Sequence, residues 1–491
     1  MRLGTRKVLD GSFSGLGIFS LLLMCAALVV LLGPIFANGG KAFVFKGTVE
    51  WRRATIDIFG RGDRESIERE VAEVEEVRAP VYRMIRDHED AFWVEFADLA
   101  QRHEMPEGIV QMIDGRQMDL GRALVKYQRR LDPYDDEAYE ESEEFAKRVD
   151  EVTVVKDLVR KLLGPLPDDE EPEVLRSKYG ARRWDRAQVH LGRLVHRVEY
   201  EYPDAYSPGV RVLKPRADDF AGTSLEPLFA YVEENIEQML RPRRTFYWRF
   251  LFDADYDDNL FGGIWAPLLG TFYLTLGAMV VAAPLGIIAA IYLTEYAGDS
   301  RFISLLRTCI STLAGVPSVV FGLFGLAFFM RTLHMPKSVF VGCLTLACLV
   351  LPTVIRASEE AIRMVPQTYR EASLSMGATK WRTIVKVVFP TALPGIITSI
   401  IISMGRAAGE TAPILFTAAV AVGAALKPWQ VFSSASPALP YSIYSVVTEN
   451  PSGQEIPHVQ FGMVMVLILL VLLLNAAALI LRARISRKLR G

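Results

Sequence analysis

Six apolar runs, each about as long as a membrane-spanning helix, constrain what this 491-residue chain can fold into. A span needs about 20 predominantly apolar residues, because hydrocarbon offers the backbone no bonding partners outside its own helix. The runs lie at residues 15–36, 264–293, 309–330, 338–355, 391–422 and 461–481. The first run is longer than the apolar core of a typical signal peptide, so we expect it to remain as an anchor. The sequence therefore predicts an all-α membrane protein with six transmembrane helices.

Charge is segregated along the chain. Residues 37–258 contain 35 Lys and Arg and 48 Asp and Glu, which gives this segment a net charge of −13. The rest of the chain contains 20 basic and 9 acidic residues, a net charge of +11, and the two parts sum to the −2 of the whole. This distribution predicts an acidic soluble domain between the first two transmembrane helices, followed by a membrane core at 259–481 and a basic tail at 482–491.

The acidic segment has the apolar periodicity of amphipathic helices. Apolar residues recur at spacings of three and four from Ile67 to Ile85, and further helical patches cover 136–163 and 224–240. Pro80 lies inside the first pattern and is expected to break or kink that helix. All four cysteines lie outside the segment, which argues against a disulfide framework. We expect a mostly helical insert.

Lys and Arg gather in alternate connections between the apolar runs. The basic connections are 1–14, 294–308, 356–390 and 482–491. The other short connections of the C-terminal half hold only Arg331, Lys337 and Lys427. Because loops rich in Lys and Arg stay in the cytoplasm, both termini are predicted to be cytoplasmic and residues 37–258 periplasmic.

Four prolines lie in or at the ends of the predicted spans: Pro284, Pro317, Pro352 and Pro413. A membrane helix tolerates proline where neighbours or water satisfy the carbonyls that it frees, and such sites often border a cavity or a moving helix. Each proline alone is compatible with kinked packing. Together we interpret them as helix kinks of a transporter.

The connection between the fourth and fifth runs contains EASLSMGATKWRTIVKVVFP, residues 371–390. It resembles the EAA loop of type I ABC-importer permeases at four positions: Glu371, Ala372, Gly377 and Pro390. Ser373 and Phe389 depart mildly from the family pattern. We expect a short helix, a turn at Gly377 and a second helix that enters the membrane. The resemblance implies that this coupling loop docks on a separate ATPase subunit and carries its motion to the membrane helices.

Further stretches resemble the PstA family of phosphate-importer permeases: AAPLGIIAAIYLTEYA (282–297), LAGVPSVVFGLFG (313–325), LPTVIRASEEAIRMVPQTYREA (351–372) and GRAAGETAPILFTA (405–418). The resemblance covers residues 260–491 well. The segment 37–258 departs from the compact members of the family, in which the first loop is short. The resemblance implies a type I ABC permease fold in the bacterial inner membrane and transport of inorganic phosphate.

The resemblance also implies partners. They are a PstC-type permease subunit, two copies of a PstB-type ATPase, a PstS-type periplasmic phosphate-binding protein and membrane lipids, with no nucleic acid. The sequence contains no G-x-x-x-x-G-K-[ST] motif, so we expect ATP hydrolysis on a separate subunit. The chain is therefore expected to be a transporter subunit rather than an enzyme. ATP and Mg²⁺ would be used by the ATPase, with no cofactor or metal bound by this chain.

Opposite charges inside the fifth run indicate a substrate pathway. Arg406 and Glu410 lie four positions apart, so they share one face of a continuous helix and can neutralise each other. Each would otherwise cost on the order of 3 kcal/mol in the bilayer. A guanidinium suits phosphate oxygens, and a nearby carboxylate can compete for it and so release the anion. With the adjacent Thr411, these residues are candidates for the pathway.

A second charged set follows the fourth run. Arg356 and Glu359, or alternatively Glu360, repeat the helical spacing of Arg406 and Glu410. We expect the two pairs to face each other near the pathway. The alternative interpretation is that they are structural salt bridges that tie the fourth and fifth spans together.

Two other functions are compatible with the sequence. Sulfate or molybdate would use the same anion chemistry, so a permease for another oxyanion is one alternative. The other is a membrane receptor that senses a ligand through residues 37–258. The coupling loop argues against a receptor, because a sensor has no need to bind an ATPase.

The distribution of Lys and Arg predicts the topology of the chain. Reporters fused near residues 150, 335 and 440 should be external, and reporters near 300, 375 and 488 should be internal. Activity of compartment-specific reporter fusions measures this directly. An internal reporter near residue 150 would contradict the six-span topology.

Overall fold

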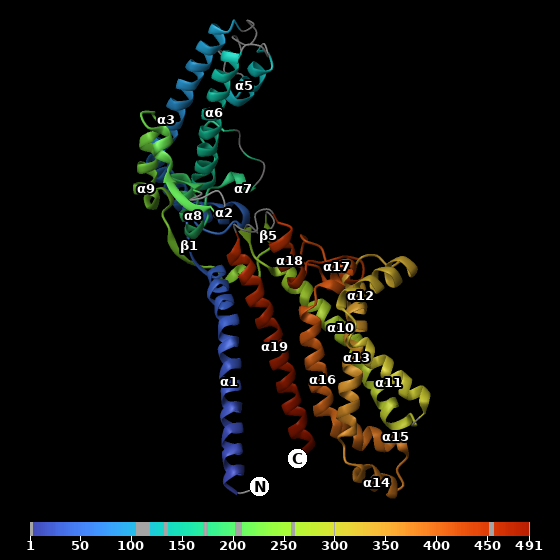
Figure 1. The fold of residues 1–491 in the computed structure, drawn as a ribbon. Coiled ribbons are helices and arrows are strands. Elements are labelled where there is room, and N and C mark those ends of the chain that lie inside the picture. The colour runs from blue at the N-terminus through green and yellow to red at the C-terminus, as the bar shows by residue number, and fades with distance from the viewer. Residues whose placement is uncertain are drawn as a thin grey trace. The chain divides into compact units, whose positions relative to one another are not determined.

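The computed structural model of the protein consists of two compact units (Figure 1). The inserted unit comprises Val44–Phe246, and the membrane unit comprises Met1–Phe43 and Tyr247–Gly491. The structure describes residues 3–104, 118–131, 136–169, 172, 175–201, 209–256, 261–298, 300–450 and 456–490.

The membrane unit is built of helices. Its α-helices are α1 (Leu3–Gly39), α10 (Trp265–Ile291), α11 (Arg301–Leu313), α12 (Ser318–Gly325), α13 (Val339–Arg363), α14 (Gln367–Ser375), α15 (Lys380–Thr383), α16 (Phe389–Gly409), α17 (Ala412–Thr417), α18 (Leu439–Thr448) and α19 (Pro457–Arg490). Three π-helical segments adjoin them: η4 (Tyr292–Tyr296), η5 (Leu326–Thr332) and η6 (Ile384–Val388). Short 3-10 turns are η1 (Gly40–Ala42), η3 (Trp248–Leu251) and η7 (Pro428–Phe432), and β5 (Asp255–Tyr256) pairs with β6 (Phe261–Gly262).

Among the described residues, five helices are long and apolar enough to cross a bilayer, or six spans if a bent helix pair counts as one. The five cover Gly15–Ala42, Trp265–Tyr296, Val339–Arg363, Lys380–Gly409 and Pro457–Arg487. They confirm the predicted all-α membrane protein. Figure 1 shows α14 and α15 at the end of the bundle where α19 ends, with α17 and α18 toward the other end.

The predicted span 309–330 is not one helix, so that part of the prediction is wrong. α11 ends at Leu313, α12 begins at Ser318, and the two are bent by 100°. Pro317 precedes α12 with a φ of −55° and a ψ of 138°. Because proline lacks an N–H group, it cannot supply the next hydrogen bond of α11, and the chain turns there.

The predicted span 391–422 also ends early. α16 stops at Gly409, Glu410 is extended with a φ of −80° and a ψ of 124°, and the short α17 follows. Pro413 has no N–H to donate to the carbonyl of Gly409, so the helix cannot continue through this stretch. The apolar residues after the break pack as α17 against α12 and α13 instead of lengthening the span.

α13 lies between α10 and α16 and packs against both. At Gly395 of α16, an added Cβ would lie only 2.7 Å from the Cβ of Ala361 on α13. Small residues permit this close approach of membrane helices. About one turn away, the hydroxyls of Ser358 and Ser399 form a hydrogen bond of 3.3 Å between the same two helices. These contacts fix the antiparallel register of α13 and α16.

The inserted unit is mostly helical with two small antiparallel sheets that the sequence did not predict. Its helices are α2 (Val49–Phe59), α3 (Arg64–Arg102), α5 (Leu120–Gln128), α6 (Asp136–Leu163), α7 (Leu175–Lys178), α8 (Trp184–Val195), α9 (Glu226–Leu240) and the 3-10 turn η2 (Arg216–Phe220). β1 (Val44–Gly47) pairs with β4 (Arg243–Phe246), and β2 (His196–Glu201) pairs with β3 (Val210–Pro215). The β1–β4 pair joins the two ends of the unit, a contact between residues about 200 positions apart.

α3 runs without interruption through Pro80, where the sequence predicts a break or kink; the break is absent. The missing N–H leaves one carbonyl of the preceding turn without its helical bond. Val77 before Pro80 and Val81 after it both pack in the main core of this unit, so packing on both sides of Pro80 holds the helix together. Tertiary contacts outweigh the local cost of the proline.

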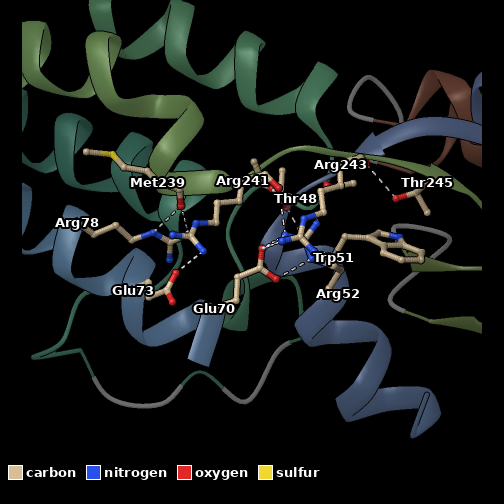
Figure 2. Close-up of polar contacts among 12 residues, drawn as sticks. Thr48, Trp51, Arg52, Glu70, Glu73, Arg78, Met239, Arg241, Arg243 and Thr245 are labelled. Atoms are coloured by element: carbon tan, nitrogen blue, oxygen red, sulfur yellow. Dashed lines mark hydrogen bonds and ion pairs between the residues drawn. The ribbon is translucent and has the colours of Figure 1, made fainter. Parts of the chain in front are cut away.

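A buried arginine connects three helices of the inserted unit. Arg78 of α3 is 1% exposed and pairs with Glu50 of α2 at 2.8 Å. Its guanidinium also donates to the backbone carbonyls of Met239 (2.8 Å) and Leu163 (3.0 Å) at the ends of α9 and α6. Figure 2 shows Arg78 with its bonds to Met239. The charge is paired and its donors are bonded, as a buried guanidinium requires.

A second arginine ties the start of the unit to its end. Arg52 of α2 donates to Glu70 of α3 at 2.7 Å and to the carbonyls of Gly47 and Arg241, each at 3.1 Å (Figure 2). The carboxylate of Glu70 also lies 3.3 Å from Arg243 of β4. These bonds reinforce the pairing of β1 with β4.

Removing the buried guanidinium should destabilise the inserted unit. We expect Arg78→Ala to lower the opening free energy of α3 and α9 by about 3–5 kcal/mol, because Glu50 is left buried and unpaired. Arg86→Ala is the matched control, since its pair with Asp168 is exposed and should contribute about 1 kcal/mol or less. Amide hydrogen exchange of the full chain measures both, and equal effects would contradict the role assigned to Arg78.

Candidate functional site

The coupling loop, residues 371–390, folds as two short helices joined by a tight turn. The N–H of Gly377 donates to Leu374 at 2.9 Å and that of Ala378 to Ser373 at 3.3 Å, which is the bonding of a Schellman motif. Gly377 has a φ of +81°, a conformation that glycine adopts without strain. Thr379 then caps α15 by accepting from the N–H of Arg382. The turn lies where the sequence predicts it.

The two short helices present their side chains to the outside of the chain. Glu371 and Ala372 of α14 are exposed. Three large apolar side chains around the turn are also exposed: Leu374 (49%), Met376 (87%) and Trp381 (64%). Contiguous exposed apolar surface rimmed by charge is typical of a protein contact site. Apolar side chains are therefore exposed beside the turn of this loop.

Arg370 fixes α14 to two membrane helices. Its guanidinium donates to Oε1 of Glu295 in η4 at 2.9 and 3.1 Å. It also donates to the carbonyls of Val365 at 2.6 Å and Ile362 at 2.9 Å, where α13 ends. The side chains of Arg370 and Glu295 are only 12% and 10% exposed. α14 is therefore held to the ends of α10 and α13 by one charged group.

Two further contacts complete this arrangement. Nζ of Lys380 in α15 lies 5.0 Å from the ring centroid of Tyr296 in η4, within the range of a cation–π interaction. The hydroxyls of Ser373 and Thr383 are 2.9 Å apart and join α14 to α15 across the turn. Both helices of the coupling loop are thus connected to the end of α10.

Arg406 and Glu410 form the predicted pair, but in a different backbone setting. Nε of Arg406 lies 3.4 Å from Oε1 of Glu410, and the side chains are 35% and 20% exposed. Arg406 is in the last turn of α16, whereas Glu410 is the first residue after it. Thr411 follows as the residue before α17, and its side chain makes no capping bond there. The charges therefore stand at a helix end rather than inside a continuous span.

Glu359 does not pair with Arg356, which corrects the prediction. Its Oε1 lies 2.6 Å from Arg363 one turn on and 3.0 Å from Arg307 of α11. Arg307 also donates to the carbonyl of Leu293 at 2.7 Å. Glu359 is buried and bonds to Arg307 of α11, whereas Arg356 is exposed. Residues three positions apart differ by only about 60° around a helix, so the spacing allows an Arg356–Glu359 pair, and the position of α11 beside Glu359 decides the partner instead.

The Arg406–Glu410 pair and the charged residues Arg356 and Glu359 also lie at different levels along the helix bundle. Ser358 lies beside Ser399, whereas Ala347 and Val350 cluster with Met404 and Ala407. The contacts of Ser358 with Ser399 and of Ala361 with Gly395 place Arg406 level with residues 350–351 of α13, roughly 8–9 Å from Arg356 at about 1.5 Å per residue. The expectation that the two pairs face each other is not met.

The four prolines have different positions. Pro284 lies inside α10 and Pro352 inside α13, while Pro317 and Pro413 lie at the starts of α12 and α17. Proline is favoured at a helix start, because the N–H it lacks would be unbonded there in any case. Pro390 of the coupling loop likewise occupies the first turn of α16.

The sequence-based site missed Arg370, Glu295 and Arg307. Each is a single charge in a connection between apolar runs, a position that is usually solvated. Two positions in the sequence could have pointed to these residues: Glu295 comes just after an apolar run, and Arg370 comes directly before Glu371. Within the part of the chain that the structure describes, no group of three or more His, Cys, Asp or Glu is placed to hold a metal ion.

Residues 282–491 match the family of binding-protein-dependent transport system inner membrane components. The chain is similar to the phosphate transport system permease protein PstA 1 of Mycobacterium tuberculosis, with 37% identity over 247 residues that cover 50% of this chain and 78% of the relative. It is also similar to the probable ABC transporter permease protein YqgI of Bacillus subtilis, with 36% identity over 46% of this chain and 80% of the relative.

Among solved structures, the chain is similar to the MetNI methionine ABC transporter in an inward-facing conformation. The identity is 19%, the alignment covers 45% of this chain and 94% of that chain, and the TM-score is 0.33. A TM-score of this size supports no argument.

Substitution of Gly377 should be penalised by the backbone conformation of the turn and not by steric contact. Nothing lies within 4 Å of an added Cβ, so only the positive φ penalises a side chain. We expect Gly377→Val to lower the opening free energy of the α14–α15 turn by roughly 1–2 kcal/mol. Asn tolerates this conformation, so Gly377→Asn should cost much less. Hydrogen exchange at Gly377 and Ala378 compares the two variants, and equal protection in both would refute the strain argument.

Proposed function

Because the chain belongs to the PstA family of phosphate transport permeases, we propose that it is the permease subunit of an ATP-driven importer of inorganic phosphate. The observation that carries this proposal is 37% identity to a phosphate permease over 78% of that relative's length. The protein is a multi-pass membrane protein that works with partner permease and ATPase subunits. It is not itself an enzyme, since ATP is hydrolysed by a separate subunit.

We propose a substrate pathway that passes Arg406 and Glu410. A guanidinium presents planar donors that match phosphate oxygens. Because the pair is partly exposed at the end of α16, an anion can reach Arg406 without the cost of opening a buried salt bridge. Glu410 competes for the same guanidinium and limits how tightly a dianion is held. Arg356 is exposed and roughly 8–9 Å farther along by the helical rise of about 1.5 Å per residue, which suits it to a separate step for the anion. Thr411 and Glu359 flank these two arginines.

The coupling loop is the proposed contact for the ATPase. Its exposed apolar side chains and the exposed Glu371 support a docking role. The partners in this proposal are a PstC-type permease, two PstB-type ATPases that use ATP and Mg²⁺, and a PstS-type binding protein. No cofactor is assigned to this chain. The inner membrane of a bacterium, with both termini cytoplasmic, is the proposed location.

We propose that the inserted unit lies in the periplasm and contacts a protein rather than phosphate. The segment 37–258 has a net charge of −13, which repels an anionic substrate. Its most buried arginines, Arg78 and Arg183, already pair with carboxylates and so offer no anion site. The receptor alternative would instead require this unit to bind a small ligand.

Uptake into membrane vesicles tests the function. Vesicles carrying the co-expressed complex should accumulate radiolabelled phosphate when ATP is present inside, in the presence of the binding protein. The same vesicles should not accumulate sulfate or molybdate. Uptake of either of those anions without phosphate would identify a permease for another oxyanion. ATP hydrolysis without uptake of any of the three would favour the receptor.

Removing only one charge of the pair should be worse than removing both. Arg406→Gln leaves Glu410 unpaired, and its negative field opposes an incoming anion. We therefore expect Arg406→Gln to reduce phosphate uptake more than the double change Arg406→Gln with Glu410→Gln, at equal protein level. Normal uptake by both variants would mean that the pair is only structural.

A further inference from the structure

We infer that the Arg370–Glu295 pair is the mechanical link through which the coupling loop moves α10 and α13. This inference rests on the proposed function, because it assumes that an ATPase moves the loop. It assigns a positioning role to two residues outside the charged pathway. The geometry that carries it is the set of four hydrogen bonds from one guanidinium to two segments, η4 and the end of α13.

Arg370 belongs to α14 but bonds only to groups outside that helix. Two of its bonds go to Glu295 in η4 and two go to the carbonyls of Ile362 and Val365. Those carbonyls lie in the last turn of α13 and directly after it, and that of Ile362 also accepts from the N–H of Val365 at 3.2 Å. A displacement of α14 therefore acts on α10 and α13 together. Without these bonds, α14 would be held only by its covalent connection to the chain, and it could tilt without moving α10 or α13.

The burial of this pair makes the link stiff. Both side chains are close to nine-tenths buried, so water does not compete for the hydrogen bonds. A charge-assisted bond in such surroundings is stronger than its exposed counterpart. By comparison, the Glu359–Arg363 pair on α13 alone has an arginine that is 54% exposed and spans only one helical turn.

π-helical turns mark both routes out of the coupling loop. Glu295 and Tyr296 lie in η4, which ends α10, and η6 connects α15 to α16. π turns are rare and are found mostly at functional sites. The wider turn of η4 brings two consecutive residues to the loop, one bonded to Arg370 and the other to Lys380. The loop thus contacts α10 at two points and continues directly into α16.

Arginine is specifically required by this geometry. Its planar fork reaches a carboxylate and two carbonyls at once, whereas a lysine ammonium is a single point charge. Arg370→Lys should therefore keep the charge and lose part of the connection. Arg370→Gln leaves Glu295 buried without a partner and is expected to impair assembly. Combining Arg370→Gln with Glu295→Gln removes the unpaired charge and should restore assembly without the link.

The test compares phosphate uptake with ATP hydrolysis in proteoliposomes that contain the complete complex and binding protein. For the double variant Arg370→Gln with Glu295→Gln, we expect ATP hydrolysis within about twofold of wild type and uptake per ATP lowered about tenfold or more. Arg370→Lys should give an intermediate ratio. Arg301→Gln is the matched control, because Arg301 is an exposed arginine at the start of α11 without an ion pair in the described part of the chain. An unchanged ratio in the double variant would overturn the inference.

A distance measurement gives a second, independent test in a protein that keeps both Arg370 and Glu295. Spin labels at Gly298→Cys and Ser375→Cys, in a background without the native cysteines, report the separation of α10 from α14. A rigid link predicts the same distance distribution with and without ATP. A shift or broadening on ATP binding would show that the loop moves independently of α10. Wild-type proteoliposomes that hydrolyse ATP but import no phosphate would refute the proposed function, and the label distances would still test the link.

Discussion

Charged groups that leave water have to be paired, because an unpaired buried charge costs more than most folds can offset. In this protein the buried pairs lie where helices end or meet. Arg78 and Glu50 join helix ends in the inserted unit, and Arg370 and Glu295 do so in the membrane unit. In both cases the arginine also bonds to carbonyls at the ends of helices. A single guanidinium thus pairs with a buried carboxylate and also donates hydrogen bonds to backbone carbonyls.

Proline sets the second constraint, by removing the donor that continues a helix. Where the surrounding chain packs on both sides, as at Pro80, Pro284 and Pro352, the helix persists. Where the chain can turn, as at Pro317 and Pro413, the helix ends and a new one begins. The breaks next to α12 and α17 place two short helices against the long helix α13. Such interrupted helices occur where backbone lines a cavity or is covered by protein.

The coupling loop and the charged pathway are joined by a single element. α16 begins at Phe389, within the coupling loop, and ends just before Glu410. It packs along α13, which at its own end bonds to Arg370. In the proposed mechanism, a movement of the loop would reach the Arg406–Glu410 pair through one helix and through the neighbour that this helix contacts. The partial exposure of Arg406 and Glu410 leaves the far end of that path accessible.

The sequence alone determined the features that depend on local chemistry. Apolar length predicted the membrane helices, charge separation predicted an insert, and Gly377 predicted the turn between the two short helices of the coupling loop. These follow from the residues themselves, since burial in lipid and positive φ need no distant partner. Local spacing also suggested that Glu359 would bond to Arg356. Only the tertiary structure could give it Arg307, which lies on a helix that a proline bends away by 100°. The partner of a buried charge is chosen by which helices pack together, and that choice is not written in the spacing of residues along one helix.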